Sequence, residues 1–465
     1  MLPTLLNRFV PASLYGGETA RPVLARIDGE IRRAESTASA AAVLENAKPD
    51  LYARLRDRFQ APAAQALTLR ILNLFLARFH FQARSVSVGS RPFGLVVDPS
   101  NVCQLACPGC VHSHRAEEFK LFDWPNGTLS EEKFSALLRL YGPYAVGIYF
   151  CSYGEPLLNL ATPRLIRQAK AYMIGTALST SFSVRKFDAE AYVESGLDIL
   201  NMSIDGATQP VYEKFRRNGS LELVLENIRR LAAAKRELGK QTPVMSWNFL
   251  AFEHNVHEIP LAERMARELG VNRFRVVNPF DVGWDDPAVR PAQVKSAMRR
   301  LDWFSVASRP DNWNPFADQT ASDAIAHEFE KSWFEKSATV PAEAAEPSRP
   351  GHTCHWLYKN MVVDATGRIT PCCGAPRPDI NLVFGNLDGD NPDPYNSARY
   401  REARAWFSAG MPALDDGAAA KAAHCTRCEW DHTAVNIGAP EIRRYFRAAD
   451  AAFFDRASIR LLADW

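Results

Sequence analysis

Residues 93–110 read Phe-Gly-Leu-Val-Val-Asp-Pro-Ser-Asn-Val-Cys-Gln-Leu-Ala-Cys-Pro-Gly-Cys, a short apolar strand followed at once by the cysteines Cys103, Cys107 and Cys110. Three thiolates at this C-x3-C-x2-C spacing can hold three irons of a cubane cluster and leave the fourth iron open. The alternative is a structural zinc site, which needs four ligands and usually takes its cysteines from two separated pairs. No fourth cysteine lies near the triplet, although two histidines do, His112 and His114. The stretch therefore favours a reactive cluster at the end of a strand.

The composition excludes several classes of protein. A chain of 465 residues predicts two or three domains. The formal charge is +2 with acids and bases interspersed, so we expect no nucleic-acid partner. Nine cysteines in groups indicate metal sites in a reducing cytosol instead of disulfides. Neither a signal peptide nor an apolar run of about 20 residues is evident, and we expect a cytoplasmic protein.

The stretch from Phe93 to Pro279 alternates short β-rich runs with helical patterns. Such repeats predict an α/β fold in which a parallel sheet curls into a partial (β/α)6 barrel, with active residues on the loops at the carboxyl ends of the strands. Thr128 or Ser130, and Thr162, are expected to cap helices that lie between strands. The predicted strands are 93–98, 146–151, 175–181, 198–205, 244–250 and 273–277.

Further polar motifs follow the predicted strands. The second strand ends in Cys151-Ser-Tyr-Gly154-Glu155-Pro156, where a glycine permits close approach of the chain and a proline fixes the turn. The third ends at Ser179-Thr-Ser181, and the fourth runs into Ser203-Ile-Asp205-Gly206. Ordinary strand-end capping and turn formation are the alternative explanation for these hydroxyl and carboxylate groups.

Taken together, the cysteine triplet, Gly154-Glu155-Pro156 and the segment from Ser203 to Gly219 resemble the radical S-adenosylmethionine (radical SAM) superfamily. The resemblance implies that the open iron of a [4Fe–4S] cluster is chelated by the amino and carboxylate groups of SAM. It also implies a SAM site formed by Gly154, Glu155, Ser179, Ser181, Ser203, Asp205 and Arg216.

Two of these positions leave alternatives open. Arg216 suits the SAM carboxylate because its planar guanidinium can bind bidentately, whereas the structural alternative is a surface ion pair with Glu213 or Glu222. The residue before the third cysteine is commonly aromatic in the superfamily and lies against adenine, but here it is Gly109. We expect the adenine to pack instead near the sixth strand, around Val276 and Val277.

A second group of cysteines lies near the C-terminus. It comprises Cys354, the step from Gly367 to Cys372-Cys373, and the pair Cys425-Thr-Arg-Cys428. This pattern resembles the auxiliary-cluster domains called SPASM or twitch. The resemblance implies one auxiliary [4Fe–4S] cluster on Cys354, Cys372, Cys425 and Cys428, with Cys373 either spare or in the place of Cys372. A zinc ribbon is the alternative.

These motifs divide the chain into a helical N-terminal extension (1–90), the barrel (91–280), a connector (281–350), a small iron–sulfur domain (351–440) and a helical tail (441–465). Within the extension, residues 64–81 are apolar over much of the predicted helix surface. We expect this helix to pack on the barrel. The alternative is an interfacial helix that docks on a membrane or a lipid-linked substrate.

The resemblance implies an enzyme that receives an electron from a low-potential reductant such as ferredoxin or flavodoxin and cleaves SAM to a 5′-deoxyadenosyl radical. This radical abstracts hydrogen from an unactivated C–H bond. A small-molecule substrate, for example a sugar, is favoured because no leader-binding module is visible; modification of a peptide or protein is the alternative. A non-catalytic iron–sulfur or zinc protein, serving as redox sensor or scaffold, would not account for the Gly-Glu-Pro and Ser-Ile-Asp segments.

Overall fold

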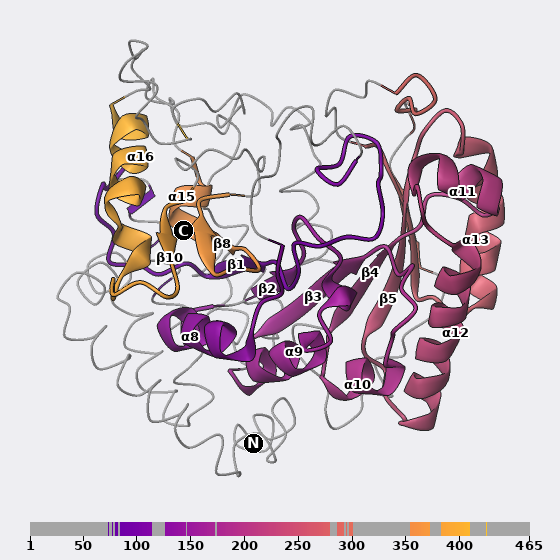
Figure 1. Ribbon diagram of the computed structural model, residues 1–465, viewed down its shortest axis with the longest axis horizontal. Coiled ribbons are helices and arrows are strands. Elements are labelled where there is room, and N and C mark those ends of the chain that lie inside the picture. Colours follow the sequence, from indigo (N-terminus) through magenta and orange to yellow (C-terminus); the bar gives the residue numbers. More distant parts are fainter. Residues whose placement is uncertain are drawn as a thin grey trace, which may run out of the picture.

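The computed structural model describes residues 73, 77, 80–81, 84–113, 126–145, 147–172, 174–279, 286–292, 294, 297–300, 354–372, 383–409 and 425. One ten-stranded sheet connects the described part of the chain, in the order β10-β9-β8-β1-β2-β3-β4-β5-β6-β7 (Figure 1). Its strands are β1 (Gly94–Val97), β2 (Gly147–Phe150), β3 (Gly175–Thr180), β4 (Ile199–Ser203), β5 (Val244–Leu250), β6 (Arg273–Val277), β7 (Ala297–Arg300), β8 (Asn360–Val363), β9 (Arg368–Thr370) and β10 (Gly385–Asn386).

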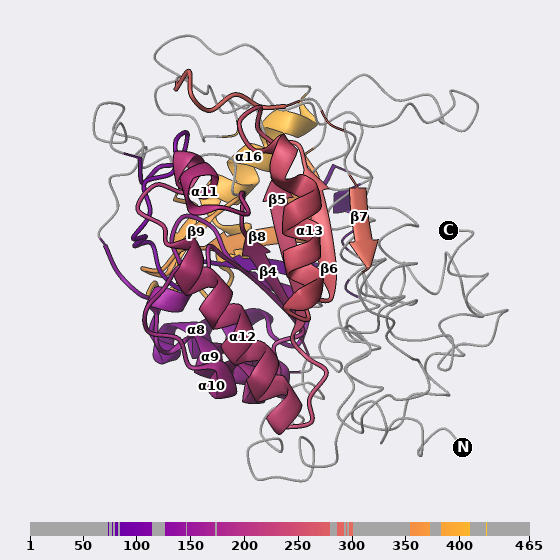
Figure 2. The same ribbon diagram turned by 90° about the vertical axis from the view of Figure 1, so that its right-hand side faces the viewer.

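Strands β1 to β6 run parallel and in chain order, which confirms each strand predicted between residues 93 and 277. β7 adds to β6 antiparallel at one edge, as Figure 2 shows, and the short β10 forms the other edge. The described strands therefore form an open, partial barrel. The helices are α8 (Glu131–Tyr141), α9 (Thr162–Ala171), α10 (Ala189–Glu194), α11 (Gln209–Phe215), α12 (Leu221–Glu237), α13 (Ile259–Glu268), α15 (Trp356–Lys359) and α16 (Ala398–Ser408), with 3-10 turns at Pro156–Leu158, Val256–Glu258 and Pro394–Asn396.

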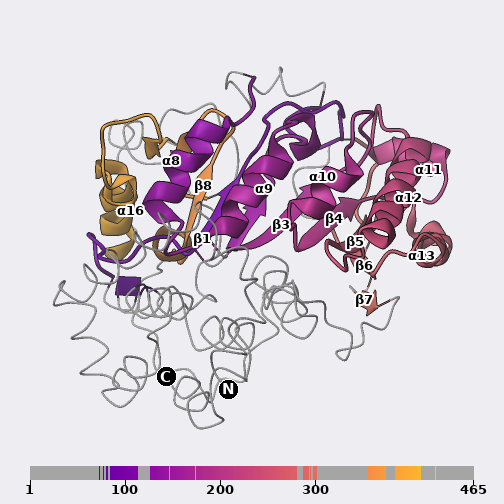
Figure 3. The same ribbon diagram turned by 90° about the horizontal axis from the view of Figure 1, so that it is seen from below.

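Alternation along the strands separates a packed face from a polar face. Leu178, Met202 and Trp247 belong to one hydrophobic cluster with apolar side chains of the helices, and α8, α9, α10 and α12 lie in a row along that face (Figure 3). Burial of such side chains is the main favourable contribution to folding. Between these residues, Ser179 and Ser203 alternate onto the opposite face of the sheet.

Side chains cap α8, α10, α12 and α16, whereas α9, α11, α13 and α15 begin without a side-chain cap. The hydroxyl of Ser130 accepts from the backbone N–H of Lys133 at 3.3 Å and caps α8, which confirms one of the two predicted caps. Thr162 was expected to cap α9, but it is already the first residue of that helix. Its hydroxyl instead donates to the carbonyl of Pro156 at 2.7 Å, because the helix packs back onto the Gly-Glu-Pro segment.

The C-terminal cysteine region joins the barrel through its strands. β8 pairs in parallel with β1, with Leu95 opposite Met361, and β9 and β10 extend the sheet from there. The predicted iron–sulfur domain and the barrel therefore share one hydrogen-bonded sheet. Of the predicted elements, residues 1–72, 301–353 and 426–465 lie outside the described residues, as do His114, Cys373 and Cys428. None of the described helices has the length and apolar character to cross a membrane.

Candidate active site

The cysteine loop begins directly after β1 and contains a tight turn over Cys107-Pro-Gly-Cys110. The N–H of Cys110 donates to the carbonyl of Cys107 at 3.0 Å, and Gly109 has φ of +75°. Proline at the second position and a positive φ at the third are the features of a type II turn. The turn therefore explains why Gly109 stands where an aromatic residue was expected, since a β-carbon would strain the backbone there.

The three thiols lie in an apolar surround formed by Leu105, Phe215, Phe252 and Val289. Burial raises the pKa of Cys103 to about 12 and of Cys107 to about 11, and it also raises the pKa of Cys110. Such thiols stay protonated until a cation binds, so iron would displace their protons.

The triplet fits a cubane that takes one thiolate on each of three irons. Within the described ranges, no three His, Cys, Asp or Glu side chains converge closely enough to ligate one metal ion. In a cubane each thiolate binds a different iron, so its ligands stand farther apart than those of a single ion.

The Gly-Glu-Pro segment packs directly on the cysteine loop. A β-carbon at Gly154 would lie 1.7 Å from the carbonyl oxygen of Ser100, so only glycine fits. The next N–H, that of Glu155, donates to the carbonyl of Val102 at 2.9 Å. His112, two residues beyond Cys110, lies with Nε2 against the carbonyl of Tyr153. The predicted close approach of Gly154 is therefore an approach to the loop that carries the cysteines.

Glu155 is buried, and its carboxylate is fully used within the protein. One oxygen accepts from the Thr180 hydroxyl at 2.5 Å and from the Leu157 N–H at 3.2 Å. The other accepts from the N–H and the hydroxyl of Ser181 at 2.8 and 2.6 Å. Four hydrogen bonds fill the roughly four acceptor positions of a carboxylate. Glu155 and Ser181, both predicted in the SAM site, thus brace the ends of β2 and β3 against each other.

Asp205 and Arg216 form a buried ion pair beside the cysteines. Arg216 Nε donates to Asp205 Oδ2 at 2.5 Å, and the second carboxylate oxygen accepts from the Leu250 N–H at 2.7 Å. Arg216 Nη1 lies 3.8 Å from Cys107 Sγ. The alternative of a surface ion pair with Glu213 or Glu222 is wrong, because the buried Arg216 pairs with Asp205 instead. Burial raises the pKa of Asp205, and the Arg216 guanidinium opposes that rise. The same guanidinium places a positive charge next to the Cys107 thiol.

Polar side chains form two rows across the strands on the face opposite the helices. Ser179 pairs with Asn201, which pairs with Ser246 on the next strand. One step nearer the carboxyl ends, Ser203 pairs with Asn248, and Asn248 with Arg275. The structure thus brings the predicted Ser179 and Ser203 onto one surface.

Sequence reasoning missed the other members of these rows. The signal was available, because Asn201-Met-Ser203 and Ser246-Trp-Asn248 alternate polar and apolar residues. Of the two valines expected near adenine, Val276 belongs to the main hydrophobic core. Val277 lies one position along β6, opposite Leu250, and so on the alternate face.

Three of the four predicted auxiliary ligands are described. Cys354 precedes α15, Cys372 follows β9, and Cys354 and Cys425 are each 6% exposed. Cys354 and Cys425 lie near a group of three tyrosines. Burial is the main cause that raises the pKa of Tyr358, Tyr395 and Tyr400. Nearby Cys354 adds to the rise at Tyr358 and Tyr395, and Cys425 adds to it at Tyr400. The Tyr400 hydroxyl also reaches the carbonyl of Thr370, two residues before Cys372, at 3.4 Å. The buried thiols of Cys354 and Cys425 and the half-buried thiol of Cys372 are of the ligand type that iron–sulfur clusters use.

Comparison with known proteins agrees with both cysteine sites. The sequence model of the radical SAM superfamily matches residues 97–246, and that of the SPASM iron–sulfur cluster-binding domain matches residues 354–429. The first range contains the cysteine triplet and the second contains the C-terminal group. A radical SAM domain takes SAM and a [4Fe–4S] cluster, and a SPASM domain takes auxiliary iron–sulfur clusters.

Curated relatives include both small-molecule and peptide cyclases. A probable GTP 3′,8-cyclase of Methanococcus maripaludis is 28% identical over 181 residues, 39% of this chain and 56% of that protein. The chain thus spans little more than half the length of this relative. The PqqA peptide cyclase of Gluconobacter oxydans is 26% identical over 305 residues, 65% of this chain and 75% of its own. Among solved structures, SuiB of Streptococcus suis bound to S-adenosylmethionine has a TM-score of 0.45 at 15% identity, covering 74% of this chain and 73% of that one.

Proposed function

We propose that this chain, a member of the radical SAM superfamily with a C-terminal SPASM domain, is an enzyme that modifies a peptide by abstracting hydrogen from an unactivated C–H bond. The observation that carries the proposal is the extent of the likeness to the PqqA peptide cyclase, which spans 65% of this chain where the GTP cyclase spans 39%. This reverses the preference for a small molecule. That preference rested on a leader-binding module not being visible in the sequence.

Some residues of the site would hold the iron–sulfur cluster, and others would orient SAM. Cys103, Cys107 and Cys110 would hold a [4Fe–4S] cluster which, with SAM on its open iron and one electron from a ferredoxin or flavodoxin, supplies a 5′-deoxyadenosyl radical. Ser179 and Ser203 offer hydroxyls to the polar groups of SAM from one face of the sheet. Because the Glu155 carboxylate has no acceptor position left, the SAM amino group would be received by backbone carbonyls of the Gly-Glu-Pro segment.

The region around Cys354, Cys372 and Cys425 would hold an auxiliary cluster, with Cys428 as the fourth ligand. We assign to it the electron that a substrate radical releases when the product is oxidised relative to the substrate. The continuous sheet from β1 into β8 holds this region in a fixed register beside the radical SAM site. A rigid connection of this kind suits transfer between two cofactors that must keep their separation.

Deuterium transfer tests the proposal. The reconstituted protein would be given SAM, a flavodoxin reducing system and uniformly deuterated peptides encoded in open reading frames beside its gene. We expect deuterium in 5′-deoxyadenosine and a mass change in one peptide. A matched reaction with deuterated GTP tests the second candidate, a small-molecule cyclase, which the GTP cyclase relatives support. Deuterium transfer from GTP and from none of the peptides would overturn the peptide assignment.

A further inference from the structure

Helix α16 buries an arginine. Tyr400, Ala403, Arg404 and Phe407 are its buried residues, and their spacing places them on one face of the helix. Arg404 is 0% exposed. Arginine is almost never fully buried unless it is paired with a charge, because its guanidinium remains a cation under all ordinary conditions. The partners of this cation therefore matter.

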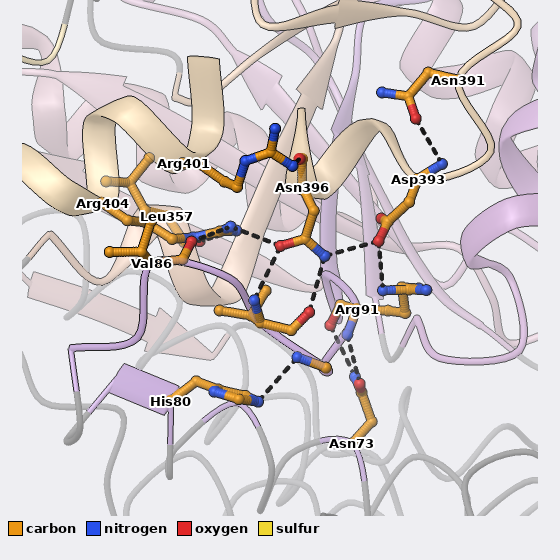
Figure 4. Close-up of polar contacts among 12 residues, drawn as sticks. Asn73, His80, Val86, Arg91, Leu357, Asn391, Asp393, Asn396, Arg401 and Arg404 are labelled. Carbon is orange, nitrogen blue, oxygen red and sulfur yellow. Dashed lines mark hydrogen bonds and ion pairs between the residues drawn. The ribbon is translucent and has the colours of Figure 1, made fainter. Parts of the chain in front are cut away.

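Every hydrogen-bond acceptor around Arg404 is neutral (Figure 4). Nε and Nη2 donate to the carbonyl of Leu357 at 3.0 and 2.8 Å. Nη1 donates to Asn396 Oδ1 at 3.1 Å and to the carbonyl of Val86 at 3.4 Å. Aromatic rings complete the surround, with the guanidinium carbon 4.7, 5.2 and 5.5 Å from the ring centres of Tyr395, Tyr400 and Tyr358. No carboxylate in the described part of the chain forms an ion pair with it.

The nearest acid in this network is already neutralised. Asp393 pairs with Arg91 at 3.2 Å and accepts from Asn396 Nδ2 at 2.7 Å, so a neutral amide stands between Asp393 and Arg404. The positive charge of Arg404 also affects the pKa of His80. Burial chiefly lowers the pKa of His80 to about 4, and the Arg404 charge adds to the effect. Among the described residues, Arg404 thus lies in a low-dielectric interior without a carboxylate to compensate it, and an uncompensated buried cation is costly.

This charge lies beside the auxiliary cysteines. The Leu357 carbonyl that binds Arg404 belongs to a residue whose N–H donates to the carbonyl of Cys354 at 3.3 Å. The three tyrosines that surround the guanidinium are also those whose pKa is raised in part by Cys354 or Cys425. Four thiolates and their iron–sulfur core form an anion, and the reduction potential of such a cluster depends on nearby charge.

We propose that Arg404 is the buried counter-charge of the auxiliary cluster and raises its reduction potential. Reduction adds a negative charge to the cluster, and a fixed cation in a low-dielectric interior stabilises the more negative state. The anionic cluster in turn compensates a guanidinium that has no carboxylate partner. The inference rests on the auxiliary cluster within the proposed function and is independent of the substrate. Arg404 is 0% exposed, so it would act on the reduction potential of the cluster and not by contact with a substrate.

Redox titration of the auxiliary cluster, followed by electron paramagnetic resonance, tests this role. Full-length protein with Cys103, Cys107 and Cys110 all changed to Ala would carry the auxiliary signal alone. In that background Arg404→Gln should lower the reduced-to-oxidised ratio at fixed potential at least tenfold, which is about 59 mV for one electron. Arg404→Lys should stay within threefold of the parent because it keeps the charge. The control Arg401→Gln changes an exposed arginine of the same helix and should shift nothing.

An unchanged potential in Arg404→Gln would overturn the proposal and leave Arg404 as a structural staple of α16. If Arg404→Gln fails to retain its cluster, Arg404→Lys decides. A retained cluster at the parental potential supports the charge, whereas loss of the cluster in Lys as well shows that the site needs the hydrogen-bonding fork and overturns it. No substrate is present in the titration, so a failed search for a peptide would leave its result intact, and an unchanged potential would leave the peptide assignment intact.

Discussion

Arg216 donates through Nε to Oδ2 of Asp205 at 2.5 Å, and the same guanidinium reaches within 3.8 Å of the Cys107 sulfur. The ion pair joins the loop after β4 to the end of α11, and its guanidinium borders the loop that carries the cysteine triplet. Its two side chains are 13% and 0% exposed, so solvent screens their interaction little. Arg216, which is predicted to bind the SAM carboxylate, therefore supports the fold of the site through this ion pair.

Removing Arg216 should destabilise the protein strongly. Arg216→Gln leaves the Asp205 carboxylate buried without its cation, which costs about 3–5 kcal/mol in the free energy of unfolding. Urea unfolding of the metal-free, reduced protein measures this. The double variant Arg216→Gln/Asp205→Asn should lose less free energy of unfolding than the sum of the losses in the two single variants. The difference, which is the coupling energy of the pair, should be about 0.5–3 kcal/mol.

The matched control is Arg229, which pairs with Glu226 on the surface of α12 at more than half exposure. Arg229→Gln should change the free energy of unfolding by no more than about 0.5 kcal/mol. Equal effects of Arg216→Gln and Arg229→Gln would show that the buried pair is not a support of the site.

Gly154→Ala should prevent assembly of the first cluster. Its new β-carbon would collide with the carbonyl of Ser100 on the loop that leads to the cysteines, and backbone cannot swing aside as a flexible side chain can. Iron content after anaerobic reconstitution is the measurement, and we expect it to fall by about half. Gly147→Ala is the control, because the closest atom to its β-carbon lies 3.9 Å away. Equal iron in the two variants would count against the packing described for Gly154.

Asp98 should make stability depend on pH. It follows β1, is fully buried, and its N–H donates to the carbonyl of Val363 at 2.8 Å, which places it beside Asp364. Burial is the main cause that raises the pKa of Asp98 to about 8; the Tyr153 N–H opposes this rise and the nearby Asp364 carboxylate adds to it. The folded state therefore holds a proton that the unfolded chain releases near pH 4. This stabilisation is complete below about pH 4 and is lost as the pH rises to about 8.

Comparison of the wild type with Asp98→Asn isolates the effect. Between pH 5.5 and 8.5, the free energy of unfolding in urea should fall by on the order of 1–3 kcal/mol more in the wild type than in the variant. Asp388→Asn, at a half-exposed ion pair with Lys133, should follow the wild type. Identical pH slopes for Asp98→Asn and the wild type would contradict the raised pKa.

Metal analysis separates the iron–sulfur from the zinc interpretation of the C-terminal cysteines. The reconstituted wild type should hold about eight irons per chain, as two cubanes, and the variant with Cys103, Cys107 and Cys110 all changed to Ala should hold about four. Four irons with one zinc in the wild type would mean that Cys354, Cys372 and Cys425 belong to a zinc site instead.

Local pattern was enough to predict the six parallel strands and the position of the cysteine loop, because alternating and apolar runs were bounded by clear turn residues. The Pro-Gly of Cys107-Pro-Gly-Cys110 could also have been recognised as a turn that excludes an aromatic residue. The partners of Glu155 and Arg216 could not be predicted. These partners come from other loops, and the sequence around a carboxylate or guanidinium does not indicate which group it will contact in the folded protein.

The joining of β8 to β1 was equally hidden. Asn360-Met-Val-Val363 is apolar enough for a strand, but its parallel neighbour lies more than 250 residues earlier in the chain. Arg404 did leave a signal, since it shares a helical face with Tyr400, Ala403 and Phe407, where an apolar residue would be expected.

The cysteine triplet is proposed to support reductive cleavage of SAM. Mass spectrometry of SAM products, after anaerobic incubation of the reconstituted protein with dithionite or a flavodoxin system, tests it most directly. We predict 5′-deoxyadenosine from the wild type even without a substrate, and none above background from Cys107→Ala. Production of S-adenosylhomocysteine alone, with no 5′-deoxyadenosine from the wild type, would contradict the account.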